Sequence, residues 1–241
     1  MSFQIVYYFD QETRQPSPFP REYRQLARKG FPVTTEPGTS ATRLLYRCPI
    51  LTQGEYPKDQ RYIGTEKTYQ SYSKMLIWYP MIEDLTIPTF FAQTLNDEVI
   101  DEIQSRGWKA AFIKDSVKSL FVDDAVPSTW PSTPLDEISR NFQLCGRKED
   151  GFSIRQYLEP QTFEEERRYW VMNHKIHHSS GVIPEIVREA ASRLDHLGGL
   201  FYTIDATPSL VVEINPGESS DRKTDNTQDD FIRWIMNAFD N

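Results

Sequence analysis

Residues 201–222 read FYTIDATPSLVVEINPGESSDR, and two strand-forming runs in this stretch decide the fold prediction. Aromatic and β-branched residues dominate 201–204 and 210–214. The segment 206–209 between them, ATPS, has the polar, proline-containing composition of a turn. The stretch therefore predicts a β-hairpin of two adjacent strands.

Three oxygen-bearing side chains lie on these two strands. Asp205 ends the first strand, and Glu213 and Asn215 stand two residues apart on the second, so the latter two project from one face. Two carboxylates and an amide suit Mg²⁺, which takes few protein oxygens and keeps its other positions for water and phosphate. Burying Glu213 beside Val212 and Ile214 is costly unless a cation or donor compensates it. We therefore expect a magnesium site here, and the alternative for Asp205 alone is a solvated carboxylate.

Composition and charge limit the class of protein. The chain has 241 residues, enough for one large domain or two to three lobes, and its hydrophobic share of 38% is ordinary for a globular protein. The net charge of −8 argues against a nucleic-acid partner, because nucleic-acid binding surfaces are basic. No apolar run approaches the ~20 residues of a membrane helix, and residues 1–10 do not resemble a signal peptide. We therefore expect a cytoplasmic protein with no membrane partner, in which Cys48 and Cys145 are buried free thiols.

The order of segments predicts an α+β protein with an α/β N-terminal lobe. Residues 3–9 and 31–33 are strand-forming, and the segment 20–29 between them is helical in pattern, with Gly30 as its stop. Such an opening suits a small lobe with a parallel sheet. We expect three lobes, and their bounds are 1–85, 86–150 and 151–241.

Two groups of side chains in the N-terminal part each have two interpretations. The tyrosines could form a substrate wall, but their spacing favours a packed aromatic face. The arginines of the predicted helix could attract an anionic acid, but a solvated helix face is favoured. The tyrosines are Tyr62, Tyr69, Tyr72 and Tyr79, and the arginines are Arg21, Arg24 and Arg28.

The middle of the chain contains two lysines in strand-like segments. Asn96 is a natural N-cap for the helix that follows it. Two strand-like pieces then occur in WKAAFIKDSVKSLFV, residues 108–122. Lys114 and Lys118 in these pieces could contact a phosphate as mobile point charges, and the alternative for each alone is a solvated lysine.

Four short motifs, in order along the chain, make the residues from about Pro88 onward resemble the ATP-grasp superfamily. The chain is most similar to the compact clade of that superfamily named for two arginines and a lysine. The motifs are FIKDSVKSL at 112–120, IRQYLEP at 154–160, ERRYWVMNHKI at 166–176 and YTIDATPSLVVEINPGESS at 202–220.

The resemblance implies an ATP-grasp fold in which two α+β lobes clamp ATP. Lys114 and Lys118 resemble the phosphate-binding cations of the family. Arg155 and Arg168 resemble its paired arginines, whose forked guanidinium groups hold phosphate or acyl-phosphate oxygens.

The resemblance also assigns the nucleoside and the metal. It places adenine at the backbone of Gln156, Tyr157 and Leu158, and the ribose hydroxyls near Glu159. The two acids and the amide of the hairpin match the Mg²⁺ ligands of the family, in agreement with their ligand chemistry.

Two positions depart from the family pattern. Many ATP-grasp enzymes carry an arginine just ahead of the first metal ligand, where this chain has Thr203, and Arg168 or Arg222 could substitute for it. The segment 115–117, DSV, lacks the glycines of the phosphate loop of larger relatives, which implies a looser cover and slow turnover.

The resemblance implies an ATP- and Mg²⁺-dependent carboxylate-amine ligase. An acid attacks the γ-phosphate to give an acyl-phosphate and ADP, and an amine then displaces phosphate to form an amide. We expect the carboxylate substrate and the amine substrate to be small molecules or peptides. Two alternatives stay open at this point: a phosphotransferase on the same scaffold, and a non-catalytic nucleotide-binding or interaction module.

Overall fold

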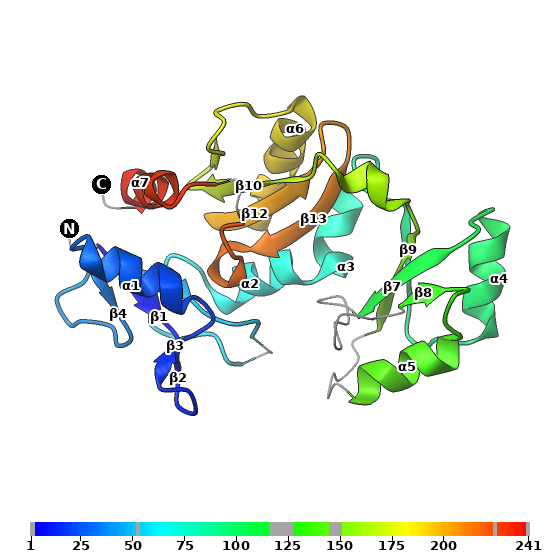
Figure 1. The fold of residues 1–241 in the computed structure, drawn as a ribbon, viewed down its shortest axis with the longest axis horizontal. Coiled ribbons are helices and arrows are strands. Elements are labelled where there is room, and N and C mark those ends of the chain that lie inside the picture. Colours follow the sequence, from blue (N-terminus) through cyan, green and yellow to red (C-terminus); the bar gives the residue numbers. More distant parts are fainter. Residues whose placement is uncertain (1–2, 52–53, 116–127, 145–150, 224–225, 240–241) are drawn as a thin grey trace. The chain divides into compact units, whose positions relative to one another are not determined.

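The chain forms two compact units in a computed structural model (Figure 1). The terminal unit comprises Met1–Tyr72 and Glu166–Asn241, and the central unit comprises Ser73–Glu165. The structure describes residues 3–51, 54–115, 128–144, 151–223 and 226–239.

The central unit contains a four-stranded antiparallel sheet with the strand order β6-β9-β7-β8. Two helices, α4 and α5, pack their apolar residues on the face that carries Ile113 and Ile154. Because side chains alternate along a strand, the residues next to these isoleucines project from the opposite face. The elements of this unit are α3 (Met75–Trp78), η1 (Tyr79–Met81), β6 (Thr89–Ala92), α4 (Asp97–Ser105), β7 (Ala111–Asp115), β8 (Thr129–Trp130), α5 (Leu135–Leu144), β9 (Phe152–Gln156) and η2 (Pro160–Phe163).

The terminal unit contains a parallel sheet with the order β4-β1-β5 and an antiparallel sheet with the order β11-β10-β12-β13. The N-terminal elements are β1 (Phe3–Tyr7), β2 (Phe9–Asp10), β3 (Gln15–Pro16), α1 (Pro20–Arg28), β4 (Val33–Thr34), β5 (Arg43–Arg47) and α2 (Glu66–Ser73). The C-terminal elements are β10 (Arg167–Met172), β11 (Lys175–His177), α6 (Glu185–Leu194), η3 (Asp195–Leu197), β12 (Phe201–Ala206), β13 (Val211–Pro216), η4 (Gly217–Ser219) and α7 (Gln228–Phe239).

Aromatic side chains join the two sheets of the terminal unit in one core. Trp170 of β10 packs against Phe201 of β12 and Phe231 of α7, with ring centroids 5.4 and 4.6 Å apart, and β1 contributes Phe3 to the same cluster. These aromatic rings fill only part of one face of the antiparallel sheet. The rest of that face is therefore free to carry polar side chains.

Several sequence predictions are confirmed in this unit. The strand-helix-strand opening is present, because β1 and β4 are parallel and α1 connects them. Cys48 is a buried free thiol, whereas Cys145 lies outside the described residues. Three tyrosines of the predicted aromatic face, Tyr62, Tyr69 and Tyr72, lie in this unit and Tyr79 lies in the central unit; all four are at least 91% buried, which supports the packing interpretation.

The predicted boundary between the second and third lobes, at residue 150, precedes β9. This strand pairs with β6 and β7, so it shares the sheet of the central unit. The division of the chain into three lobes stays a prediction. Within the described ranges, no helix combines the length and the apolar character needed to cross a membrane.

Candidate functional site

The hairpin of β12 and β13 brings the predicted metal ligands into register. Asp205 lies directly across from Glu213, and Thr203 lies across from Asn215. Opposed residues, and residues two apart on one strand, share a face of a sheet, so all four side chains lie on one face. A hydrogen bond of 2.9 Å from the Thr207 N–H to the Leu210 carbonyl closes the turn that sets this register. The hairpin and the shared face are confirmed, and the role as metal ligands stays a prediction.

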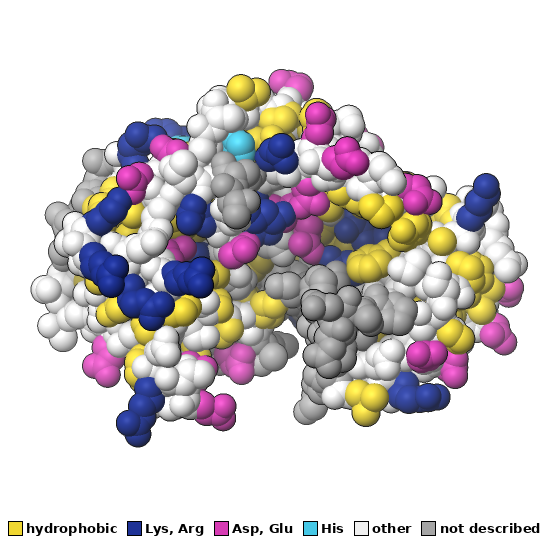
Figure 2. Space-filling view, viewed as in Figure 1, with side chains coloured by type: hydrophobic (Ala, Val, Ile, Leu, Met, Phe, Trp, Pro, Cys, Tyr) yellow, Lys and Arg dark blue, Asp and Glu magenta, His cyan; other side chains and the backbone are white. Residues whose placement is uncertain are grey.

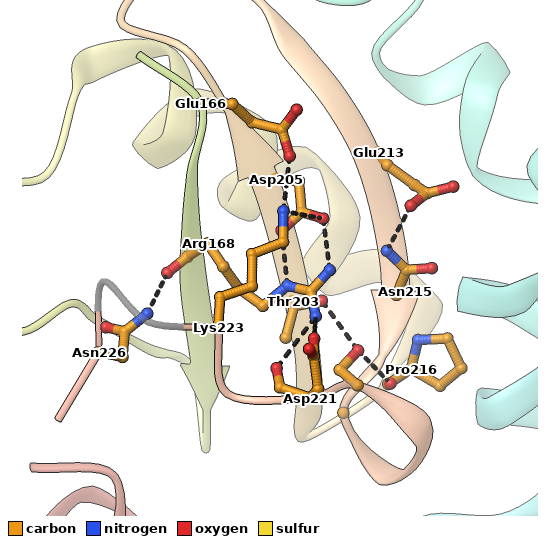
Figure 3. Close-up of polar contacts among 12 residues, drawn as sticks. Glu166, Arg168, Thr203, Asp205, Glu213, Asn215, Pro216, Asp221, Lys223 and Asn226 are labelled. Carbon is orange, nitrogen blue, oxygen red and sulfur yellow. Dashed lines mark hydrogen bonds and ion pairs between the residues drawn. The ribbon is translucent and has the colours of Figure 1, made fainter. Parts of the chain in front are cut away.

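Strand β10 adds a guanidinium group to the same row of side chains. Arg168 lies across from Asp205, and its Nε and Nη2 donate to Oδ1 and Oδ2 at 2.7 and 2.6 Å (Figure 3). The Nη1 of Arg168 also donates to the Asp221 carboxylate and, at 3.0 Å, to its backbone carbonyl. Burial acts to lower the pKa of Arg168, but the hydrogen bonds and charge of Asp205 outweigh it and raise this pKa. Arg168 is therefore a permanently charged group that two acids fix in place.

A second cation reaches Asp205 from the loop after β13. The Nζ of Lys223 lies 3.3 Å from Asp205 Oδ2 and 2.6 Å from Glu166 Oε1. Arg222, a candidate substitute for the missing arginine, instead donates to the Asn226 carbonyl. Lys223 and Glu166 are absent from the sequence predictions, because a lysine in SSDRK and an acid in EEER resemble solvated surface charges.

The charges and donors at this face suit a divalent cation. Four carboxylates and two cations leave a net charge of −2 in a group that we name the acid–cation cluster: Glu166, Arg168, Asp205, Glu213, Asp221 and Lys223. Asn215 Nδ2 donates to Glu213 Oε2 at 3.0 Å, so the amide oxygen is the atom left to bind an ion. Oδ1 of Asp205 keeps a further lone pair beside its bond from Arg168, whereas the second lone pair of Oδ2 faces Lys223.

No three His, Cys, Asp or Glu side chains among the described residues converge closely enough to hold a metal ion by themselves. A cation here would take few protein ligands and complete its shell with water or phosphate oxygens. This is the binding pattern of Mg²⁺ rather than of a structural zinc ion.

The loop that follows β13 is held by a buried arginine from β5. Arg47 is fully buried and donates to the carbonyls of Gly217, Glu218 and Ser220. Its charge is balanced by Glu22 of α1, with Nε–Oε1 and Nη2–Oε2 distances of 2.9 and 3.0 Å. The sequence predictions do not include Arg47, because RLLYR resembles an ordinary strand end and no local signal marks its arginine as buried.

Two further buried polar groups fix this loop. Burial raises the pKa of Glu218 to about 7, and the Tyr56 hydroxyl donates to its Oε1 at 3.2 Å. Ser220 donates to the Pro216 carbonyl at 2.8 Å, and its hydroxyl lies 3.1 Å from that of Thr203. Thr203 is thus buried and bonded to the loop.

The arginines of α1 lie on its exposed face. This helix turns Glu22 and Leu26 toward the core and leaves residues 21, 24 and 28 exposed. On the face shown in Figure 2, Lys and Arg side chains gather over α1. This exposure fits the solvated helix face that the sequence favours.

In the central unit, the predicted phosphate-binding residues share one face of the sheet. Lys114 lies across from Ser153, and Arg155 lies two residues beyond Ser153, so the three side chains project from the face opposite α4 and α5. Lys114 and Arg155 are 6% and 4% exposed, and Arg155 Nη2 lies 3.4 Å from Thr86 Oγ1. The Ser153 hydroxyl is buried and has no hydrogen-bond partner among the described residues. It is a donor that an anion on this face would satisfy. Lys118 lies outside the described residues.

The predicted adenine segment follows β9 directly. The N–H groups of Gln156 and Tyr157 already donate to the carbonyls of Pro88 and Ala110, at 2.9 and 3.1 Å. A backbone contact with adenine would therefore use the carbonyls of these residues or the N–H of Leu158. Glu159 is exposed, and its assignment to ribose stays a prediction.

Comparison with solved structures finds proteins of the same fold. The chain is similar to D-cycloserine synthetase DcsG, with a TM-score of 0.63 and 15% identity over 98% of each chain. It is similar to macrocyclase MdnC from Microcystis aeruginosa MRC, bound with precursor peptide MdnA, with a TM-score of 0.55 and 12% identity over 92% of each chain. It is also similar to the ATP-grasp ligase PsnB, complexed with minimal precursor, Mg and ADP, with a TM-score of 0.52, 8% identity, and coverage of 92% of this chain and 90% of PsnB.

No family model and no curated protein sequence matches the chain. At these identities the structural likeness shows the fold alone. The chain has an α+β ATP-grasp fold, so the predicted fold class is confirmed. Membership of the clade named for two arginines and a lysine stays a prediction.

Proposed function

We propose that the protein is an ATP- and Mg²⁺-dependent ligase that joins a carboxylate to an amine. The observation that supports this most directly is the acid–cation cluster on the hairpin. There Asp205, Glu213 and Asn215 share one face, and Arg168 is fixed beside them by two hydrogen bonds of 2.6 and 2.7 Å. The ATP-grasp fold and its ligase neighbours support the same reaction class.

Each group in the proposal has one task. Asp205, Glu213 and Asn215 would hold Mg²⁺, which when bound offsets the negative charge of the phosphate oxygens. Lys114, Arg155 and Arg168 would each bind phosphate oxygens by charge-assisted hydrogen bonds. Because positioning and charge compensation carry the catalysis, no nucleophilic side chain is required.

The proposed reaction has two steps. An oxygen of the acid forms a bond to the γ-phosphorus as the bond from that phosphorus to the bridging oxygen breaks, which gives an acyl-phosphate and ADP. The amine nitrogen then forms a bond to the acyl carbon, inorganic phosphate leaves, and the amine releases a proton. The structure of MdnC contains a precursor peptide and that of PsnB a minimal precursor, so peptides belong beside small molecules in a substrate screen for this chain.

Calorimetric titration with ATP, with and without Mg²⁺, tests the nucleotide and metal parts. We expect Mg²⁺-dependent ATP binding, weakened about tenfold or more in Glu213→Gln, which keeps the shape of the side chain and leaves the Arg168–Asp205 pair in place. Glu189→Gln on the exposed face of α6 is the control and should bind like the wild type. Failure of the wild-type protein to bind MgATP would overturn the proposal.

Trapping with hydroxylamine tests the reaction class. Hydroxylamine converts an acyl-phosphate to a hydroxamate, so ADP release with hydroxamate formation would support a ligase. ADP release with a stable phosphorylated acceptor and no hydroxamate would instead show a phosphotransferase. MgATP binding without turnover of any acid would show a non-catalytic nucleotide-binding module.

A further inference from the structure

Lys223 has no task in the proposed function, yet its position is unusual. Its φ of 52° lies in the left-handed region, which is uncommon for a residue other than glycine and is maintained where surrounding contacts impose it. Its side chain is 34% exposed and places Nζ between the carboxylates of Glu166 and Asp205 (Figure 3). This backbone conformation thus directs the flexible side chain of Lys223 toward the other members of the acid–cation cluster.

The two cations on Asp205 are held unequally. Arg168 makes two bonds of 2.6 and 2.7 Å to Asp205, is further fixed by Asp221, and is 7% exposed. At Asp205, Lys223 makes a single contact of 3.3 Å, to the Oδ2 atom that already accepts from Arg168, and its shorter contact of 2.6 Å is to Glu166. Lys223 is therefore held at Asp205 more weakly than Arg168, and of the two it is the one that a cation bound at Asp205 would displace first.

We infer that Lys223 is a phosphate-binding residue that moves from Asp205 to the transferred phosphoryl group of ATP when Mg²⁺ binds. This inference rests on the proposed function. The ammonium group of Lys223 would be repelled by a divalent cation held at Asp205, and the flexible stem of lysine lets its charge move while the backbone stays fixed. The anion that enters with Mg²⁺ is the triphosphate, which becomes the new partner of the ammonium group.

Lys223→Gln separates this role from a structural one, because the inference predicts two effects of opposite sign. Without nucleotide, Mn²⁺ should bind more tightly to the variant, since the net charge of the cluster falls from −2 to −3 and Asp205 loses a competing cation. With nucleotide, MgATP should bind about tenfold to a hundredfold more weakly, the range for a charge-assisted hydrogen bond. MgADP binding should change little, because ADP lacks the transferred group. Electron paramagnetic resonance of free Mn²⁺ and calorimetry supply the two readouts.

Two variants control the experiment. Arg222→Gln removes a charge from the neighbouring residue, whose guanidinium donates to the Asn226 carbonyl instead, and should leave both affinities near the wild-type values. Lys223→Arg keeps the charge and should retain most of the MgATP affinity. Thermal unfolding of each variant checks that the fold is intact.

The outcomes distinguish this inference from the proposed function. A wild-type protein that fails to bind MgATP overturns both. If the wild type binds MgATP, then unchanged MgATP binding by Lys223→Gln overturns the inference alone. Parallel weakening of Mn²⁺ and MgATP binding would also overturn it, because that result shows a structural role for Lys223.

Discussion

Glu22→Gln removes one negative charge from the interior of the terminal unit and keeps the shape of the side chain. Glu22 accepts from Arg47 at 2.9 and 3.0 Å and from the Tyr7 hydroxyl at 2.6 Å, and Arg47 is fully buried. The variant therefore leaves a buried guanidinium group without a counter-charge. We expect a large loss in the free energy of unfolding.

The structure sets the size of this loss. Two opposite charges about 4 Å apart attract by about 4 kcal/mol at the effective dielectric constant of about 20 that describes such sites. Breaking a buried pair by removing one partner costs about 3–5 kcal/mol, in the same range. For a chain of this length, such a loss lowers the melting temperature by roughly 6–20 °C.

An exposed ion pair provides a matched control. Arg193 donates to Glu189 on α6 at 2.8 Å, nearly the distance of the Arg47–Glu22 pair, but its side chains are 33% and 48% exposed. Glu189→Gln should cost less than about 0.5 kcal/mol, because solvent screens exposed pairs. The two substitutions are chemically the same and differ mainly in burial.

Urea unfolding followed by tryptophan fluorescence measures both variants, since the Trp170 ring centroid lies 5.8 Å from the Arg47 guanidinium carbon. Equal losses for Glu22→Gln and Glu189→Gln would show that burial does not set the cost of removing the charge. The double variant Glu22→Leu/Arg47→Met removes both charges and should recover part of the stability lost by Glu22→Gln.

Three further predictions follow from individual contacts. Burial raises the pKa of Glu218 to about 7, whereas the unfolded chain releases this proton near pH 4.5, so between these values the folded protein alone keeps it. The free energy of unfolding should therefore fall by up to about 1.4 kcal/mol for each unit that the pH rises in this range. Urea unfolding of Glu218→Gln should lack this slope. Lys114→Ala should weaken ATP binding more than adenosine binding in calorimetry, whereas equal weakening would remove Lys114 from the phosphate site. Gly199→Ala should cost about 1–3 kcal/mol in urea unfolding, because its Cβ would overlap the Tyr72 ring that stacks on Tyr202; an unchanged stability would show that this ring moves at no cost.

Local sequence patterns were sufficient for the hairpin and for the face shared by Glu213 and Asn215. Strand propensity, side-chain alternation and turn composition act over a few residues, so they are visible in a short window. The start of α4 after Asn96 was predictable for the same reason, although the Asn96 side chain makes no capping hydrogen bond. The fold class followed from four such windows in order, and each of them covers only one or two elements.

The pairing of the strand at 152–156 shows the limit of local patterns. The strand at 152–156 is easily recognised, but the choice of its partners is not, because pairing with β6 and β7 depends on contacts with residues 37 or more positions away. Backbone hydrogen bonds to a distant strand leave little trace in the sequence of either strand.

The hairpin and its two acids and amide could be predicted from residues close together in the chain, and the ATP-grasp fold from the resemblance of four short motifs to that superfamily. In contrast, the contacts that Arg168 and Lys223 both make with Asp205, and the hold of Arg47 on the loop after β13 across a separation of 170 positions, exist in the folded chain alone. Charges that are far apart in the chain acquire their partners when packing excludes water around them. That exclusion is a property of the assembled core, and no short segment of the sequence contains it.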